Sequence, residues 1–440
     1  VRNLCRSPSY RVLNIFFTGN CLCFDPWLAA ICALNFLSSF MTSLFSTLRR
    51  SVVRAAVSLA AIAFTVGLSP LQVQAQIPAP EAPEIAARAY LLLDVTANQI
   101  LASRELDMPV EPASMTKLMS AYLVFDALKS KKIDMKQSFA VSERASKMPG
   151  SRMFIDPKMK VPVEDLIKGM VVQSGNDATV ALAEGLGGTV ERFVQMMNDQ
   201  AKVLGMKNTS YKNPEGSTES GHITTARDLS TLAMRLAHDF PEHMGTYAIK
   251  RYRYPGSPAA NDTNRNLLIF KDPTVDGMTT GHTDAAGYCL VATAKRDFPN
   301  LGARRLMAIV LGASSETVRA NEAQKLLNWG YTAFEAVKLF EAGQPVATPV
   351  IWKGKAATVK LGRSDALVVA VPTGSAAQIK TQLVRPDPLV APVTKGQAIG
   401  SLKIFRNEHL WVDMPLQALD AVEQAGVLGR AWDALRLWIK

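Results

Sequence analysis

The pattern of apolar and polar positions first predicts a hairpin, then a block of helices, then strands again. Residues 88–106, RAYLLLDVTANQILASREL, hold two apolar runs around the turn-like TANQ, which predicts a β-hairpin. From Ser114 to about Lys129 the apolar residues recur at helical spacing. Further helical patterns lie at 163–172, 178–186, 190–204, 226–239 and near 322–340, with strand-like runs at 288–294 and 306–312. Strands on both sides of a helical block predict an α+β domain with one antiparallel sheet.

The pattern changes again after about Gly343. Residues 344–415 form short alternating runs broken by Gly and Pro, which is typical of a small all-β domain. The last segment, 416–440, is helical from Leu428 onward, with one apolar face and a charged face opposite. The apolar face comprises Leu428, Ala431, Trp432, Leu435 and Ile439, and the charged face Arg430, Asp433 and Lys440. This pattern favours an amphipathic helix in a membrane interface, and a helix packed on its own protein is the alternative.

The amino-terminal residues read as a targeting region. Residues 41–75 combine three arginines, a 14-residue apolar stretch (55–68) and the small-residue pattern Val73-Gln74-Ala75, so we expect a secretory signal peptide and a mature chain from Gln76. An uncleaved membrane anchor is the alternative, although the apolar stretch is short for a bilayer span. Residues 1–40 fit no domain and are left as an unassigned upstream segment, and the Pro-rich residues 76–86 are interpreted as a linker.

Composition and charge narrow the classes of protein. The chain has 440 residues, 48% hydrophobic and 20% charged, which predicts two or three folded domains. The net charge is +11, but six Arg and one Asp in the first 75 residues account for +5, which leaves +6. Without a basic run, so small an excess argues against a nucleic-acid partner.

The cysteines and histidines suggest neither a disulfide framework nor a metal site. Four of the five cysteines lie in the first 40 residues, and Cys289 is interpreted as a small buried hydrophobe. His238 and His243 are too far apart for a pair of ligands one helical turn apart. We therefore expect no metal and no cofactor.

The candidate chemistry begins in the segment PASMTKLMSAYLVF, where Ser114 precedes Lys117 by three residues. One helical turn places a lysine amine beside a serine hydroxyl, and a lysine with a lowered pKa can take the hydroxyl proton. On its own, the motif equally describes a helix cap followed by a solvated lysine.

Two more polar segments follow it along the chain. Ser174-Gly175-Asn176 interrupts two helical patterns and offers a hydroxyl and an amide. Thr280-Gly281-His282 precedes a strand-like run. A glycine beside a strand lets a substrate backbone approach and pair with the strand edge.

In this order, the three segments resemble the active-site set of penicillin-binding proteins and serine β-lactamases. The surrounding blocks are similar to the D-alanyl-D-alanine carboxypeptidases, which are low-molecular-mass penicillin-binding proteins. These blocks are EPASMTKLM, SGNDATVALAE, KNPEG, TTARDL, TNRNLL, DGMTTGHTDAAGYCLVATAKR and RLMAIVLGA. The resemblance implies a penicillin-binding/β-lactamase-like transpeptidase domain over 87–343, in which a helical subdomain packs on an antiparallel sheet.

The resemblance also implies roles. Ser114 attacks the carbonyl of the penultimate D-alanine to give an acyl-enzyme, and Lys117 acts as general base. Ser174 passes the proton to the leaving amine, and Asn176 binds the substrate amide and Lys117. The backbone N–H groups of Ser114 and His282 form the oxyanion hole.

The substrate carboxylate is assigned by the resemblance to Arg265 and Arg319, together with the third segment. Here the chain departs from the family, because Thr279-Thr280-Gly281 replaces Lys-Thr-Gly. Loss of a charge-assisted contact costs about 1.5–3 kcal/mol, or about tenfold to a hundredfold. Two hypotheses therefore stand: a carboxypeptidase, and a weakened or inactive peptidoglycan-binding protein.

A β-lactamase is a third option, but it requires an added carboxylate base to deacylate penicillin, and the sequence does not indicate one. The partners that we expect are peptidoglycan stem peptides, β-lactams as acylating inhibitors, and a membrane surface contacted by the terminal helix. The expected location is the periplasmic face of the inner membrane.

Overall fold

The computed structural model describes residues 80–439. The unassigned upstream segment 1–40, the expected signal peptide 41–75 and the first part of the expected linker therefore lie outside the described residues. The predicted hairpin is confirmed: β1 (Ala89–Asp94) and β2 (Gln99–Arg104) pair in antiparallel fashion.

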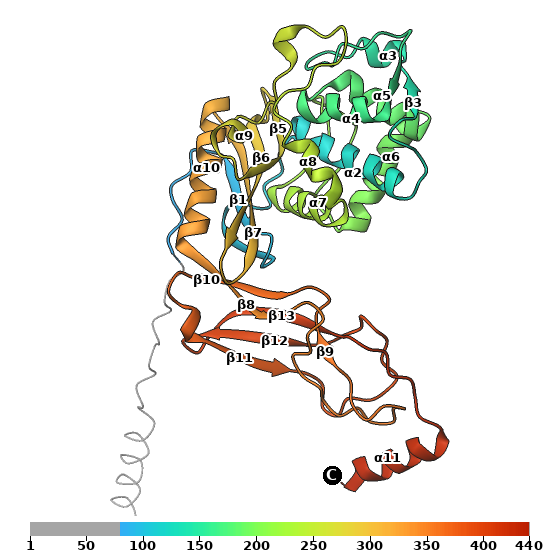
Figure 1. The fold of residues 1–440 in the computed structure, drawn as a ribbon, viewed down its shortest axis with the longest axis vertical. Coiled ribbons are helices and arrows are strands. Elements are labelled where there is room, and N and C mark those ends of the chain that lie inside the picture. Colours follow the sequence, from blue (N-terminus) through green and yellow to red (C-terminus); the bar gives the residue numbers. More distant parts are fainter. Residues whose placement is uncertain (1–79, 440) are drawn as a thin grey trace, which may run out of the picture. The chain divides into compact units, whose positions relative to one another are not determined.

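A five-stranded antiparallel sheet forms the centre of the first domain (Figure 1). Its order is β2-β1-β7-β6-β5, with β5 at Val275–Thr283, β6 at Gly287–Phe298 and β7 at Gly302–Ala313. Side chains alternate along β1, so Leu91 and Leu93 pack with the helical subdomain, whereas Tyr90 and Leu92 pack with one long helix on the other face. The sheet is thus buried on both faces, and β5 is left at an edge.

The helical subdomain covers one face of this sheet (Figure 1). Its helices are α2 (Lys117–Lys129), α3 (Glu143–Ser146), α4 (Val163–Val172), α5 (Asn176–Gly187), α6 (Val190–Leu204), α7 (Ala226–Asp239) and α8 (Met244–Tyr247). Short 3-10 turns, η1 (Ala113–Thr116), η2 (Pro241–His243) and η3 (Ala259–Asn261), and the pair β3 (Ser138–Ala140) and β4 (Lys160–Pro162) complete it. The short helix α9 (Leu268–Lys271) instead packs Leu268 and Ile269 into the core on the other face of the sheet. The predicted helices 163–172, 190–204 and 226–239 are confirmed to the residue. Thr225 caps α7, because its hydroxyl accepts a hydrogen bond from the Asp228 N–H.

The helix expected near 322–340 is wrong at both ends. Helix α10 spans Glu316–Ala333 and covers the second face of the sheet, and the chain then continues directly as strand β8 (Phe334–Phe340). Strand β8 pairs with β10 (Leu367–Pro372), and the buried Arg304 donates a hydrogen bond to the Phe334 carbonyl where β8 begins. Pairing with a distant strand therefore overrides the local helical pattern.

The second domain is all-β and begins at β8, ten residues before the expected start at 344. Its other sheet has the order β11-β12-β13-β9. These strands are β9 (Leu361–Gly362), β11 (Ile379–Val384), β12 (Ala398–Arg406) and β13 (His409–Ala418), with the turn η4 (Ala376–Gln378) before β11. The domain core joins the two sheets, because β10 packs Val369 and Val371 against Ile404 and Leu416. Helix α11 (Val427–Ile439) follows and has no buried residue.

Candidate active site

A cleft of about 530 Å³ lies where η1, the start of α5 and the edge strand β5 meet. It brings together eight of the ten predicted site residues: Ser114, Ser174, Asn176, Arg265, Thr280, Gly281, His282 and Arg319. The other two, Lys117 and Thr279, are not among its lining residues. Lys117 lies behind Ser114, and Thr279 is half-buried in β5.

Lys117 contacts the nucleophile directly. Ser114 lies in the 3-10 turn η1 and Lys117 is the first residue of α2, so the turn places the lysine Nζ 3.1 Å from Ser114 Oγ. The same Nζ donates to Asn176 Oδ1 and to the Glu215 carbonyl, each at 2.7 Å. A lysine that is only 4% exposed is thereby fixed by three acceptors from three segments.

Burial sets the protonation of this lysine. Because the charged form loses hydration, the pKa of Lys117 falls to about 7, although the charges of Glu215 and Asp177 oppose the shift. The neutral amine that a general base requires is therefore well populated near neutral pH.

Ser174 lies in the turn between α4 and α5, and Asn176 is the first residue of α5. Ser174 has a left-handed backbone (φ 56°), and within residues 80–439 its buried Oγ has no hydrogen-bond partner. Ser174 lines the cleft, so this unpaired hydroxyl lies directly beneath the cleft surface. Asn176 is held on both sides, because its Oδ1 accepts from Lys117 and its Nδ2 donates to the Pro149 carbonyl at 2.7 Å.

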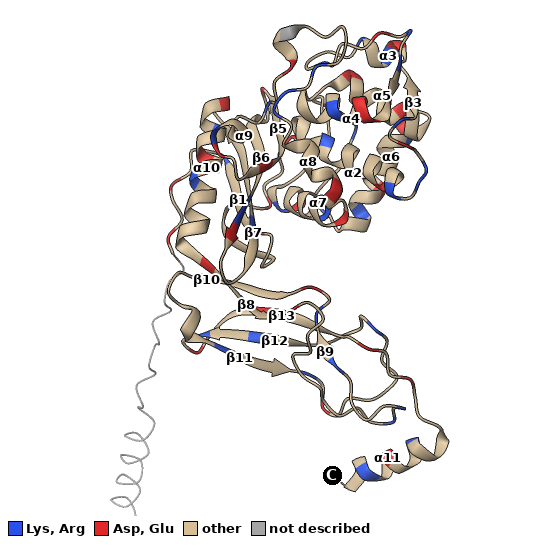
Figure 2. Cartoon of the chain, in the orientation of Figure 1, with Lys and Arg blue, Asp and Glu red and all other residues tan. Residues whose placement is uncertain are grey.

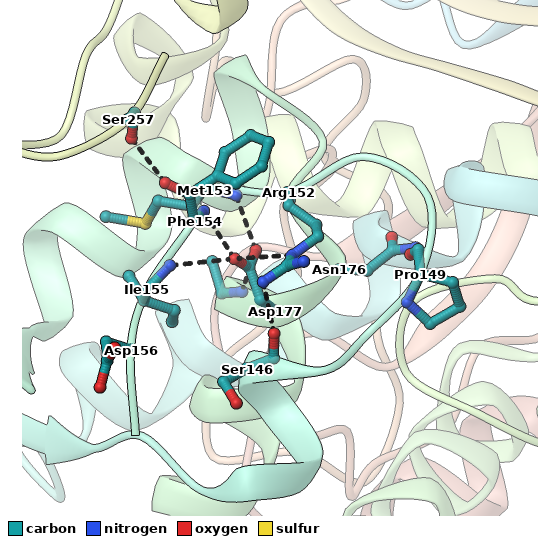
Figure 3. Close-up of polar contacts among 12 residues, drawn as sticks. Ser146, Pro149, Arg152, Met153, Phe154, Ile155, Asp156, Asn176, Asp177 and Ser257 are labelled. Carbon is teal, nitrogen blue, oxygen red and sulfur yellow. Dashed lines mark hydrogen bonds and ion pairs between the residues drawn. The ribbon is translucent and has the colours of Figure 1, made fainter. Parts of the chain in front are cut away.

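Asp177 holds the neighbouring cleft wall in place (Figure 3). Its fully buried carboxylate accepts hydrogen bonds from the backbone N–H groups of Met153 and Phe154, both at 2.7 Å, and of Ile155 at 3.3 Å. The cleft-lining residues 149–151 lead into this segment. Sequence reasoning passed over Asp177, and the available signal was an acidic residue in the first turn of a helix directly after Asn176.

The third predicted segment precedes strand β6, as expected, and it also lies within a strand of its own, β5, which the sequence analysis did not predict. Gly281 allows β5 to approach η1, because a Cβ at this position would lie 3.1 Å from Ala113 Cβ and 3.2 Å from Ser114 N. The close approach brings the backbone of β5 beside that of Ser114, as an oxyanion hole requires.

Two arginines supply positive charge to the cleft. Arg319, in the first turn of α10, is 3% exposed and donates to the Gly281 carbonyl at 3.2 Å, while its Nη2 lies 3.2 Å from Glu316. Arg265 donates to Asn261 Oδ1 at 2.9 Å. Burial and the nearby Arg265 charge both lower the pKa of Arg319, which indicates that the two cations share one region of the cleft.

Sequence reasoning also missed Glu215, whose side chain lines the cleft and is only 4% exposed. Glu215 lies in the block KNPEG, which carries part of the family resemblance, but no spacing assigns it a role, because its loop meets Ser114 only after folding. Among residues 80–439, no group of three or more His, Cys, Asp or Glu side chains is arranged to hold a metal ion.

Comparisons with known proteins agree with this site. The profile of the D-alanyl-D-alanine carboxypeptidase family matches residues 76–315, and that of the C-terminal domain of penicillin-binding protein 5 matches residues 334–424. The D-alanyl-D-alanine carboxypeptidase DacC of Escherichia coli is 37% identical over 361 residues, which cover 80% of this chain and 88% of that protein.

Solved structures match both domains. Penicillin-binding protein 5 from Haemophilus influenzae aligns with a TM-score of 0.71 and 35% identity over 78% of this chain and 99% of its own. A penicillin-binding protein of Listeria monocytogenes, in an ampicillin-bound form, aligns with a TM-score of 0.51 and 28% identity over 57% of this chain and 99% of its own. The expected transpeptidase-like fold is confirmed, and the chain belongs to the D-alanyl-D-alanine carboxypeptidase family.

Proposed function

We propose that this protein removes the terminal D-alanine from peptidoglycan pentapeptides through an acyl-enzyme on Ser114. The observation that carries the proposal is the contact between Ser114 Oγ and Lys117 Nζ at 3.1 Å, with the pKa of that lysine lowered to about 7. A hydroxyl beside a largely neutral amine is the arrangement that nucleophilic catalysis by serine requires.

Acylation then proceeds in two proton transfers. Lys117 takes the proton of Ser114 Oγ as that oxygen attacks the carbonyl carbon of the penultimate D-alanine. The backbone N–H groups of Ser114 and His282 stabilise the oxyanion. Ser174, whose Oγ is free of protein partners among the described residues, passes a proton to the leaving amine. The C–N bond breaks, and D-alanine departs.

The substrate lies along the free edge of β5. An extended peptide can pair with the backbone of this strand beside Gly281, as peptides do at open sheet edges. Its terminal carboxylate lies at Arg265 and Arg319, and Asn176 contacts its amide. Penicillins acylate the same serine, which is supported by the ampicillin-bound form of the related Listeria protein.

The first test is release of D-alanine from a peptide ending in Lys-D-Ala-D-Ala, measured beside labelling with a fluorescent penicillin. We expect both in the parent protein and neither in Ser114→Ala. Labelling without release would contradict the carboxypeptidase, and absence of both would leave a peptidoglycan-binding protein.

The lowered pKa of Lys117 predicts the pH dependence of acylation. Only the neutral amine can accept a proton, so the rate of penicillin labelling should rise with pH and level off above a midpoint near 7. Below the midpoint it should fall about tenfold per pH unit. Lys117→Arg, which keeps the positive charge, should not label at any pH. A midpoint near 10 would show that burial does not lower the pKa of Lys117.

Thr279 raises the alternative of a weakened enzyme, which the comparisons do not favour. Arg265 and Arg319 provide cations for the substrate carboxylate, but neither replaces an amine in proton transfer. We therefore expect Thr279→Lys to raise D-alanine release about tenfold to a hundredfold. Thr358→Lys, at an exposed threonine of the second domain, is the matched control and should release D-alanine as the parent protein does. A revertant no faster than the parent protein would mean that Thr279 does not limit turnover.

Attachment of the enzyme to a membrane surface through α11 is the second part of the proposal. The helix exposes Leu428 (87%), Trp432 (62%) and Trp438 (85%), and basic residues are interspersed along it (Figure 2). Among the described residues, no helix is both long and apolar enough to cross a bilayer. An exposed amphipathic helix with tryptophans suits the headgroup region. The signal peptide supports export, with the periplasmic face of the inner membrane as the site of action.

Co-sedimentation of the protein with vesicles of anionic and zwitterionic lipids tests the attachment. The double variant Trp432→Ser/Trp438→Ser should lose vesicle binding by about tenfold or more, because each tryptophan buries a large apolar surface on insertion. Val203→Ser removes an exposed apolar residue from α6 and should bind as the parent does. Equal binding of the double variant and the parent would refute the attachment.

A further inference from the structure

Hydrolysis of the acyl-enzyme requires a group that accepts a proton from water. We infer that the Glu215 carboxylate is this group, which makes it a second proton acceptor in the cleft beside Lys117. The inference rests on the proposed function, since it assigns the second half of the same reaction.

The segment that carries Glu215 lies directly against the nucleophile. The Glu215 carbonyl accepts a hydrogen bond from Lys117 Nζ at 2.7 Å, and that Nζ is 3.1 Å from Ser114 Oγ. Gly216 has φ 97°, and a Cβ on it would lie 2.9 Å from Ser114 N and collide with the Ala113 carbonyl. Only a glycine permits this approach, so residues 215 and 216 are fixed within contact distance of the acylation site.

The loop holds the carboxylate in one orientation. Asn213 Oδ1 accepts hydrogen bonds from the backbone N–H groups of Gly216 at 2.8 Å and Ser217 at 3.0 Å. Ser217 Oγ then donates to Glu215 Oε1 at 2.7 Å. Among the described residues, no hydrogen bond engages the other oxygen, Oε2. A buried carboxylate with one oxygen anchored and one open to the cleft is suited to orient a water molecule.

Two carboxylates line the cleft, Glu215 and Glu316, and their surroundings differ. Glu316 is 57% exposed and pairs with Arg319 at 3.2 Å, so its charge is already engaged by a guanidinium group. Glu215 is 4% exposed, and its charged neighbour is the lysine beside the reacting serine. Asp177, also close to Lys117, has its oxygens occupied by backbone N–H groups and does not line the cleft. Glu215 is thus the carboxylate that combines access to the acyl group with a free acceptor.

Deacylation transfers the acyl group from Ser114 to water. The water oxygen forms a bond to the acyl carbonyl carbon while Glu215 takes one water proton. The ester bond between that carbon and Ser114 Oγ breaks, and the proton held by Glu215 ends on Oγ. The products are a free peptide carboxylic acid, the serine hydroxyl and the ionised carboxylate.

The variant Glu215→Gln tests the assignment, because it keeps the shape and the hydrogen bond from Ser217 but not the base. At about pH 8, above the Lys117 pKa of about 7, acylation should proceed at the parent rate, while deacylation should fall about 10²-fold or more. With the Lys-D-Ala-D-Ala peptide, the variant should therefore release a burst of one D-alanine per enzyme and then stall, with the acyl group on Ser114 found by mass spectrometry. Glu316→Gln, the same change in the same cleft, should turn over continuously.

Two results would overturn the inference. Deacylation of Glu215→Gln at the parent rate would assign both steps to Lys117. An equal fall in acylation and deacylation would give Glu215 a positioning role only. Failure of the proposed function is a different result, since the parent protein would then form no acyl-enzyme on Ser114 at all.

Discussion

The burial of Lys117 is the constraint on which the active site depends. An ammonium group without water is costly, so the site is stable only if the lysine is largely neutral or its hydrogens are all accepted. Both protonation states are accommodated: burial lowers its pKa to about 7, so the neutral form is populated near neutral pH, and Ser114, Asn176 and the Glu215 carbonyl surround the Nζ hydrogens of the charged form. Because these partners come from η1, α5 and a loop after α6, one side chain ties together three segments, of which the last lies 98 residues beyond Lys117.

Those segments are positioned by groups that take no part in the chemistry. Asp177 binds the backbone N–H groups of residues 153–155 and so fixes the wall beside Asn176. Gly281 and Gly216 allow β5 and the 215–216 loop to approach η1 closely. A side chain at either glycine would displace the backbone at Ser114. The precision of the site therefore comes from close backbone contact as much as from the catalytic side chains.

The spacing of apolar residues predicted the helices that bury a single face. It failed at residues 334–340, where a helical pattern is overridden by pairing with a distant strand. Helices α4, α6 and α7 follow from their apolar spacing, and Thr225 marks a true cap. Residues 334–340 continue a helical pattern, yet they pair with β10. The Ser-x-x-Lys spacing indicated the Ser114–Lys117 contact because one helical turn creates it. Glu215 carries no such signal, since its place beside Ser114 arises only when two distant loops meet.

The charges of the cleft are separated in a way that explains how it can function with threonine at position 279. Arg265 and Arg319 supply the cations for a carboxylate, and burial beside Gly281 fixes Arg319 in place. Lys117 is held close to neutrality, so it does not compete with them for the anion. Glu215 adds a negative charge on the side of Lys117, where an anionic substrate group would be repelled. In the proposed mechanism the substrate carboxylate is therefore directed to the arginines, and we expect the missing lysine to affect proton transfer more than orientation.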